Sequence, residues 1–188
     1  LMTEEIEFIL DFAQEQMQES ISRLEGVLSK IRAGKASPQM LSTVKVDYYG
    51  AITPLSQMAN INTPDSQTIS IQPFDKSVMG DIEKAITEAN LGLNPMNNGE
   101  IIMINIPALT EERRKDLVKQ VKLETENCKV SVRNTRQKAN DEVKKLSKDG
   151  LSEDMARDAE SSVQTLTDEY IALTDKHFED KQKDVMTI

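Results

Sequence analysis

The sequence predicts an α+β protein in which a small α/β domain is inserted into a long antiparallel three-helix bundle. Apolar residues recur every three or four positions over three long segments, which is typical of amphipathic helices. Between the first and second segments this pattern gives way to short β-branched runs separated by glycine and proline. One amphipathic helix cannot bury its own apolar face, whereas three of similar length can bury theirs together. We therefore assign residues 1–31 and 107–188 to the bundle and residues 32–106 to the inserted domain.

The first helix is predicted over residues 3–31. Thr3 can act as its N-cap, and Glu4 and Glu5 favour the positive end of the helix dipole. The pattern ends at Gly34, a residue that disfavours a continuing helix. The apolar face consists of Ile6, Leu10, Ala13, Met17, Ile21, Leu24, Leu28 and Ile31.

The inserted domain is predicted to contain three strands and one helix. Residues 44–49, 68–72 and 101–106 are β-branched or alternate in polarity, which predicts strands. Residues 76–90 place apolar side chains at helical spacing and predict a short helix. Turns are predicted at residues 91–95 and 97–99, which are rich in Gly, Pro and Asn.

The second helix is predicted over residues 111–148, where Gly150 ends it, and the third from an N-cap at Ser152 to about Asp184. Each is roughly 50 Å long or longer at about 1.5 Å per residue. The apolar face of the second is Leu117, Val121, Cys128, Val132, Thr135, Ala139 and Leu146; that of the third is Met155, Ala159, Val163, Leu166, Tyr170, Leu173 and His177.

An inserted domain requires two chain crossings between the domains, which we expect near residues 32–38 and 105–107. Few contacts cross such short links, so they form a natural hinge. The hinge residues that we select are Gly34, Pro38, Asn105 and Pro107.

No catalytic or metal-binding pattern is present in the sequence. A single cysteine, Cys128, and a single histidine, His177, allow neither an intrachain disulfide nor a four-ligand zinc site. Both fall on apolar helix faces, and we expect packed side chains. The pair Gly34 and Lys35 resembles a phosphate-binding loop, but Ala36 follows where the motif needs Ser or Thr. We expect no enzyme, no metal and no cofactor.

The amino-terminal segment and the overall hydropathy indicate a protein without a membrane partner. No apolar run approaches the roughly 18 residues needed to span a bilayer. Glutamates stand near the start of the chain, where a signal peptide would carry basic residues. We expect a monomer located in the cytoplasm, or in an organelle matrix.

Charge is strongly segregated along the chain, although the net charge is −9. Residues 113–148 carry twelve bases and five acids, while residues 1–31 carry seven acids and two bases. The bases recur at steps of three, four, seven or eight, about 100° from the apolar face. We call this set the basic stripe: Lys115, Lys119, Lys122, Lys129, Arg133, Arg136 and Lys144.

The basic stripe is suited to phosphate groups. Arg133 and Arg136 lie one helical turn apart and can hold adjacent phosphates with their planar guanidinium groups. Few aromatic residues are nearby, so the shape and backbone of folded RNA are favoured over single-strand stacking. A solvated helix face with i,i+4 ion pairs would give a similar pattern, and Glu126 within the stripe fits that alternative.

Seven ordered segments, from the end of the first predicted helix to the second, resemble the signature of the ribosome recycling factor family, and the last helix matches mainly in pattern. They are residues 31–38 (IRAGKASP), 48–50 (YYG), 53–55 (TPL), 72–76 (QPFDK), 91–95 (LGLNP), 107–115 (PALTEERRK) and 132–136 (VRNTR), the last followed by 139–141 (AND). Each segment is short, and their common order and spacing make the resemblance specific.

This resemblance implies an L-shaped protein of two domains, similar in outline to transfer RNA. It implies a partner, the ribosome, with the bundle against large-subunit ribosomal RNA and the inserted domain toward the small subunit. Elongation factor G, using GTP, would drive the dissociation of the post-termination ribosome from mRNA and into subunits. Motif position gives Arg32, Arg133 and Arg136 as RNA-binding residues and Arg113 as a further candidate. The basic stripe adds Lys122 and Lys129.

Two other classes of protein fit parts of the sequence. A helical-bundle interaction protein could use the basic stripe to meet an acidic protein partner; salt-dependent binding to purified ribosomes would separate the two. An enzyme acting on RNA would need acid/base residues around a pocket, which the sequence does not indicate. Failure to cleave or modify ribosomal RNA would exclude that class.

Overall fold

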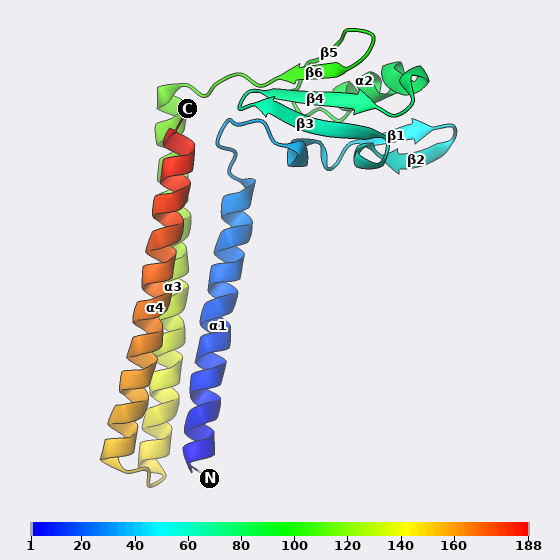
Figure 1. Ribbon diagram of the computed structural model, residues 1–188. Coiled ribbons are helices and arrows are strands. Elements are labelled where there is room, and N and C mark those ends of the chain that lie inside the picture. The colour runs from blue at the N-terminus through cyan, green and yellow to red at the C-terminus, as the bar shows by residue number, and fades with distance from the viewer. Residues whose placement is uncertain (1, 188) are drawn as a thin grey trace. The chain divides into compact units, whose positions relative to one another are not determined.

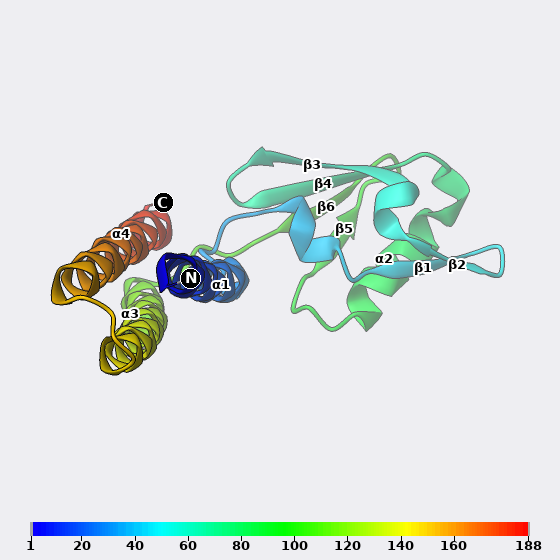
Figure 2. The ribbon, with the colours of Figure 1, turned by 90° about the horizontal axis from the view of Figure 1, so that it is seen from below.

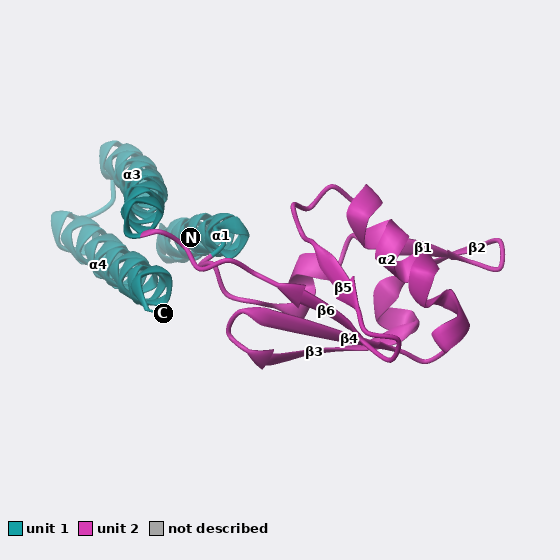
Figure 3. Ribbon diagram, turned by 90° about the horizontal axis from the view of Figure 1, so that it is seen from above, with its two compact units in different colours: residues 1–32, 111–188 teal, residues 33–110 magenta. Residues whose placement is uncertain are grey.

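The computed structural model describes residues 2–187 and divides into two compact units (Figures 1 and 3). One unit comprises the chain up to Arg32 and from Glu111 onward, and the other is Ala33–Thr110. The predicted α+β class, a three-helix bundle with an inserted α/β domain, is confirmed.

The bundle consists of α1 (Met2–Lys30), α3 (Glu111–Lys148) and α4 (Glu153–Met186). Viewed from one end, the three helices occupy the corners of a triangle (Figure 2). The chain direction of α3 opposes that of α1 and α4, and each pair of helices is in contact. Among residues 2–187, no helix combines the length and apolar character needed to cross a membrane.

The helix boundaries follow local chemistry. The Ser152 hydroxyl accepts a hydrogen bond from the Met155 N–H at 3.2 Å, which confirms the predicted N-cap of α4. Gly150, with φ of 109°, takes the left-handed conformation that ends α3. The predicted N-cap at Thr3 is wrong, because α1 already includes Met2 and Thr3 lies in its first turn.

The bundle core contains polar side chains that the predicted apolar faces omitted. Thr125, Thr167 and Thr174 are buried, and each hydroxyl donates to a carbonyl three or four residues earlier. These local bonds satisfy groups that would otherwise be costly to bury. Met155 was predicted to face inward, but it is 37% exposed, so that assignment is wrong.

The inserted unit contains two antiparallel sheets beside one helix. A hairpin joins β1 (Lys45–Tyr48) and β2 (Ala51–Pro54). The larger sheet has the order β3 (Ala59–Asp65), β4 (Thr68–Pro73), β6 (Ile102–Asn105), β5 (Pro95–Asn97). The remaining elements are α2 (Met79–Glu88) and the 3₁₀ turns η1 (Pro38–Leu41), η2 (Leu55–Gln57) and η3 (Lys76–Val78). Ile69, Ile71, Ile82, Ile102 and Ile104 are completely buried, so this unit has its own core.

Three of these strands were predicted from the sequence. β1 and β6 lie within predicted segments, and β4 exceeds its predicted segment by one residue, Pro73, whereas β2, β3 and β5 were not predicted. The turn predicted at residues 91–95 ends in β5, which begins at Pro95. The helix predicted at 76–90 starts with the 3₁₀ turn η3, so α2 is shorter than expected.

We predict that Cys128 reacts with thiol reagents only when the bundle opens. Its side chain is buried, and its Sγ lies 3.5 Å from the Thr174 hydroxyl and 3.6 Å from the Ser20 carbonyl oxygen. Burial raises the pKa of the thiol, so little reactive thiolate is present at neutral pH. Labelling with a chromogenic disulfide in increasing urea should follow the loss of helical circular dichroism. Rapid labelling of the fully helical chain would contradict this expectation.

Candidate nucleic-acid interface

The basic stripe is carried by one uninterrupted helix. α3 runs for 38 residues without glycine or proline, so its side chains project at regular steps of about 100°. Five stripe residues are exposed, namely Lys115, Lys119, Lys122, Arg133 and Lys144. The other two, Lys129 and Arg136, are half-buried, so the stripe runs close to the contact with α4.

Arg133 and Arg136 form the strongest candidate for binding phosphate. Arg133 is exposed, one helical turn before Arg136. The Arg136 Nη1 donates to Gln164 Oε1 of α4 at 3.5 Å, and Gln164 Nε2 donates to Asp168 Oδ1 at 2.8 Å. A guanidinium group has five N–H donors, so this bond orients Arg136 while using one of them. Gln164 was not predicted as a site residue, because its contact with Arg136 depends on the pairing of α3 with α4.

Lys129 does not lie on an open flank, which corrects the prediction for this residue. Its side chain is only 16% exposed, and its Nζ pairs with Asp175 of α4. Glu126, on α3 itself, lies 3.9 Å from the same ammonium group. Two carboxylates therefore offset this charge, and Lys129 acts mainly as a link between α3 and α4.

Arg32 and Arg113 lie at the same end of the bundle. Arg32 is exposed two residues after the end of α1, and Arg113 is exposed in the first turn of α3. Because α1 and α3 are antiparallel, the end of one meets the start of the other. They add two cations at the end of the bundle where α3 begins, toward which Lys115, Lys119 and Lys122 of the basic stripe also run.

The residues selected for the hinge differ in their surroundings. Pro38 is the first residue of η1, and Asn105 pairs with Thr68 as the last residue of β6, so both belong to ordered elements of the inserted unit. Gly34 has φ of 71°, and Pro107 is exposed after β6. The links lacking regular structure are therefore residues 31–37 and 106–110.

Both links are attached to one turn of the inserted unit. The Ala36 N–H donates to the Ser66 carbonyl oxygen at 2.8 Å, and the Ile106 N–H donates to the Gln67 carbonyl oxygen at 2.7 Å. Ser66 and Gln67 connect β3 to β4. These bonds hold the two crossings side by side where they leave the sheet.

We predict opposite consequences for Lys129→Ala and Arg133→Ala. Loss of the Lys129 pair should lower the free energy of unfolding by about 1 kcal/mol, as for partly exposed ion pairs, with little loss of RNA affinity. Loss of Arg133 should leave the unfolding midpoint nearly unchanged and weaken binding to RNA. Urea titrations and filter binding measure the two effects. Equal loss of affinity in both variants would show that Lys129 contacts RNA directly.

A helical bundle with cations along one helix and an inserted α/β unit defines a binding protein suited to a nucleic-acid partner. The chain belongs to the ribosome recycling factor family, because the family model described as ribosome recycling factor matches residues 24–186.

Similar proteins cover the whole chain. The ribosome-recycling factor of Flavobacterium psychrophilum is 54% identical over 187 residues, which is 100% of both chains. That of Bacillus licheniformis is 49% identical and covers 96% of this chain and 98% of its own. A solution structure of the ribosome recycling factor, 36% identical, gives a TM-score of 0.75 and covers 98% of each chain.

A second solved structure concerns a larger assembly. It is similar to this chain with a TM-score of 0.61 at 43% identity, covering 97% of this chain and 99% of the other. It describes the T. thermophilus ribosome recycling factor and the E. coli elongation factor G bound to the E. coli post-termination complex.

Proposed function

We propose that this chain recycles ribosomes in the cytoplasm. It binds the post-termination ribosome and, with elongation factor G and GTP, promotes its dissociation from mRNA and into subunits. The observation that carries the proposal is the likeness to ribosome-recycling factors along the full chain. The cationic surface of α3 supports it, because ribosomal RNA presents a dense array of phosphates.

In this proposal the chain is not itself an enzyme. The bundle supplies a stiff element that binds RNA through Arg32, Arg113, Lys122, Arg133 and Arg136. The inserted unit moves as a rigid body on the links at residues 31–37 and 106–110, because it has its own core and only two covalent connections. The energy for the motion comes from GTP hydrolysis by elongation factor G.

The test is subunit splitting measured by light scattering. Post-termination ribosomes mixed with this chain, elongation factor G and GTP should dissociate, and omission of any one component should stop the reaction. The chain alone should hydrolyse no GTP. Ribosomes that stay intact with all components present would refute the proposal, and GTP turnover by the chain alone would refute its non-enzymatic part.

A further inference from the structure

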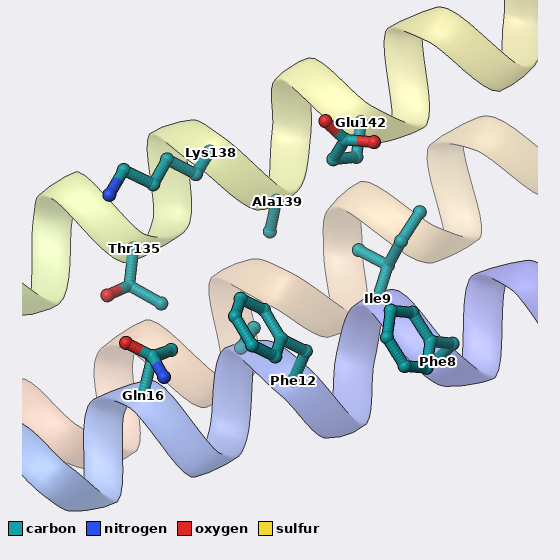
Figure 4. A pocket seen from close by; sticks show the side chains of 9 residues that line it. Phe8, Ile9, Phe12, Gln16, Thr135, Lys138, Ala139 and Glu142 are labelled. Carbon is teal, nitrogen blue, oxygen red and sulfur yellow. The ribbon is translucent and has the colours of Figure 1, made fainter.

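A groove between α1 and α3 lies away from the basic stripe. It is lined by Phe8, Ile9, Phe12, Ala13, Gln16, Thr135, Lys138, Ala139 and Glu142 and has a volume of about 360 Å³. Figure 4 shows the α1 residues along one edge of the groove and the α3 residues along the other. This volume is within the range of pockets that accept a small ligand or a few side chains.

The groove exists because small residues occupy the core beneath it. Ala13 of α1, Ala139 of α3 and Val163 of α4 form one buried cluster. Two alanines facing each other leave space that larger side chains would fill. Phe12 borders this space from α1, and Figure 4 shows its ring between the two helices.

Two aromatic rings at the groove remain largely in solvent. Phe8 is 70% exposed and Phe12 is 51% exposed, and their rings stack with centroids 6.2 Å apart and planes 12° apart. A single exposed apolar residue is ordinary, whereas two stacked rings beside an apolar groove form a continuous patch. Such patches commonly mark interaction sites.

The charges around the patch indicate the chemistry of its partner. Residues 2–22 contain six acids and no Lys, Arg or His. Four exposed carboxylates stand three or four residues from one of the two rings, namely those of Glu4, Glu5, Asp11 and Glu15. On the α3 edge, Lys138 is the one cation among the lining residues, and Lys145 nearby pairs with Glu142 at 3.0 Å.

This charge distribution separates the three kinds of occupant. RNA phosphates would be repelled by the α1 carboxylates. A second copy of this chain would bring two acidic α1 segments together, with the same repulsion. A protein segment that combines apolar and basic side chains would fill the groove and offset the carboxylates, as in helix-in-groove recognition.

We propose that the groove formed by Phe8, Phe12 and Ala139 docks a basic amphipathic segment of a partner protein. An apolar side chain of that segment enters between α1 and α3 and packs on the two phenylalanine rings. Flanking lysines or arginines meet Glu5, Asp11 and Glu15. This contact goes beyond the proposed RNA-binding role, since it uses the opposite side of α3 and the opposite sign of charge.

Fluorescence anisotropy with a labelled helical peptide tests this proposal on the full chain. The probe has leucines and one tryptophan on one face and lysines on the other, and a matched probe replaces every lysine by glutamate. The lysine peptide should bind the wild-type chain. Phe8→Ala with Phe12→Ala should weaken this binding by about tenfold or more. Charge reversal of Glu5, Asp11 and Glu15 to lysine should weaken it as well, with both rings present.

The control variant removes exposed apolar side chains elsewhere on the bundle. Leu123→Ala with Val130→Ala truncates two α3 residues that are 59% and 52% exposed, and it should bind the lysine peptide like wild type. Both double variants keep every charge, so nonspecific attraction to the acidic chain cannot distinguish them.

Equal affinity of the phenylalanine variant and wild type would overturn the proposal. Absence of binding at about 1 mM peptide, or preference for the glutamate peptide, would do the same. A wild-type dimer lost in the phenylalanine variant would assign the groove to a second copy.

Discussion

A chain carrying both Arg133→Glu and Arg136→Glu is expected to bind ribosomes about 100-fold more weakly than wild type. Hydrogen bonds to charged groups contribute about 1.5–3 kcal/mol each, and a carboxylate in place of a guanidinium adds repulsion from the phosphates. The measurement is the affinity for purified ribosomes at several salt concentrations. The salt dependence should also become shallower, because fewer counterions are released on binding.

A charge-matched variant separates local contact from overall charge. Lys138→Glu with Lys145→Glu changes the net charge by the same amount on the other side of α3, away from the basic stripe. It should lose much less affinity than the arginine variant. Both variants should keep the helical circular dichroism of wild type, because the altered side chains lie at the edge of the core or outside it. Equal loss of affinity in the two would indicate that only net charge matters and would remove the specific role of Arg133 and Arg136.

The long helices could be predicted from the sequence because their signal is repeated many times. Each of α1, α3 and α4 presents apolar residues over many turns, and α3 was predicted with its observed bounds, Glu111–Lys148. Thr167 and Thr174 escaped notice, because a threonine is buried only when its hydroxyl finds a partner. Here that partner is a carbonyl one turn earlier in the same helix.

Two of the three missed strands, β3 and β5, could not be predicted because they lie at the edges of the larger sheet. β3 is an edge strand with an irregular register between Asn62 and Asp65, and it contains Pro64. Edge positions tolerate proline and asparagine because one side of the strand needs no ladder partner. β5, at the other edge, begins with Pro95 and has only three residues. Composition therefore left β3 without an assignment and placed Pro95 and Asn97 of β5 in predicted turns, and only the neighbouring strands make both segments part of a sheet.

For the candidate interface, the sequence predicted on which side of α3 the basic residues lie, but not which residues of α4 they contact. Heptad geometry placed Arg133 on an exposed flank, as the structure has it. The same geometry placed Lys129 there, although Asp175 of α4 covers it. A helical pattern gives the angle of a side chain about its own axis. It does not give the position of a carboxylate on another helix 46 residues later in the chain.

Gly34→Ala is expected to reduce subunit splitting strongly while leaving ribosome binding by the bundle largely intact. Gly34 has φ of 71°, a conformation that costs an L side chain about 1–2 kcal/mol. A Cβ atom at this position would also lie 2.5 Å from Cγ of Leu109 and 2.9 Å from its Cδ1. Leu109 belongs to the second link, so the substitution forces apart the two crossings that Ala36 and Ile106 hold together. If the motion of the inserted unit depends on these links, subunit splitting should be lost while the bundle still binds RNA.

Two further variants isolate the contact between the links. Gly92→Ala has the same φ of 71° but no atom within 4 Å of the added Cβ, so it carries the backbone strain without the collision. It should split ribosomes at nearly the wild-type rate. Leu109→Ala combined with Gly34→Ala removes the colliding atoms and should restore most of the splitting activity. Binding is measured by cosedimentation with the large subunit, and splitting by light scattering with elongation factor G and GTP.

Normal splitting by Gly34→Ala would show that the arrangement of the links is not needed for recycling. Equal losses of binding and splitting would assign the effect to folding rather than to motion.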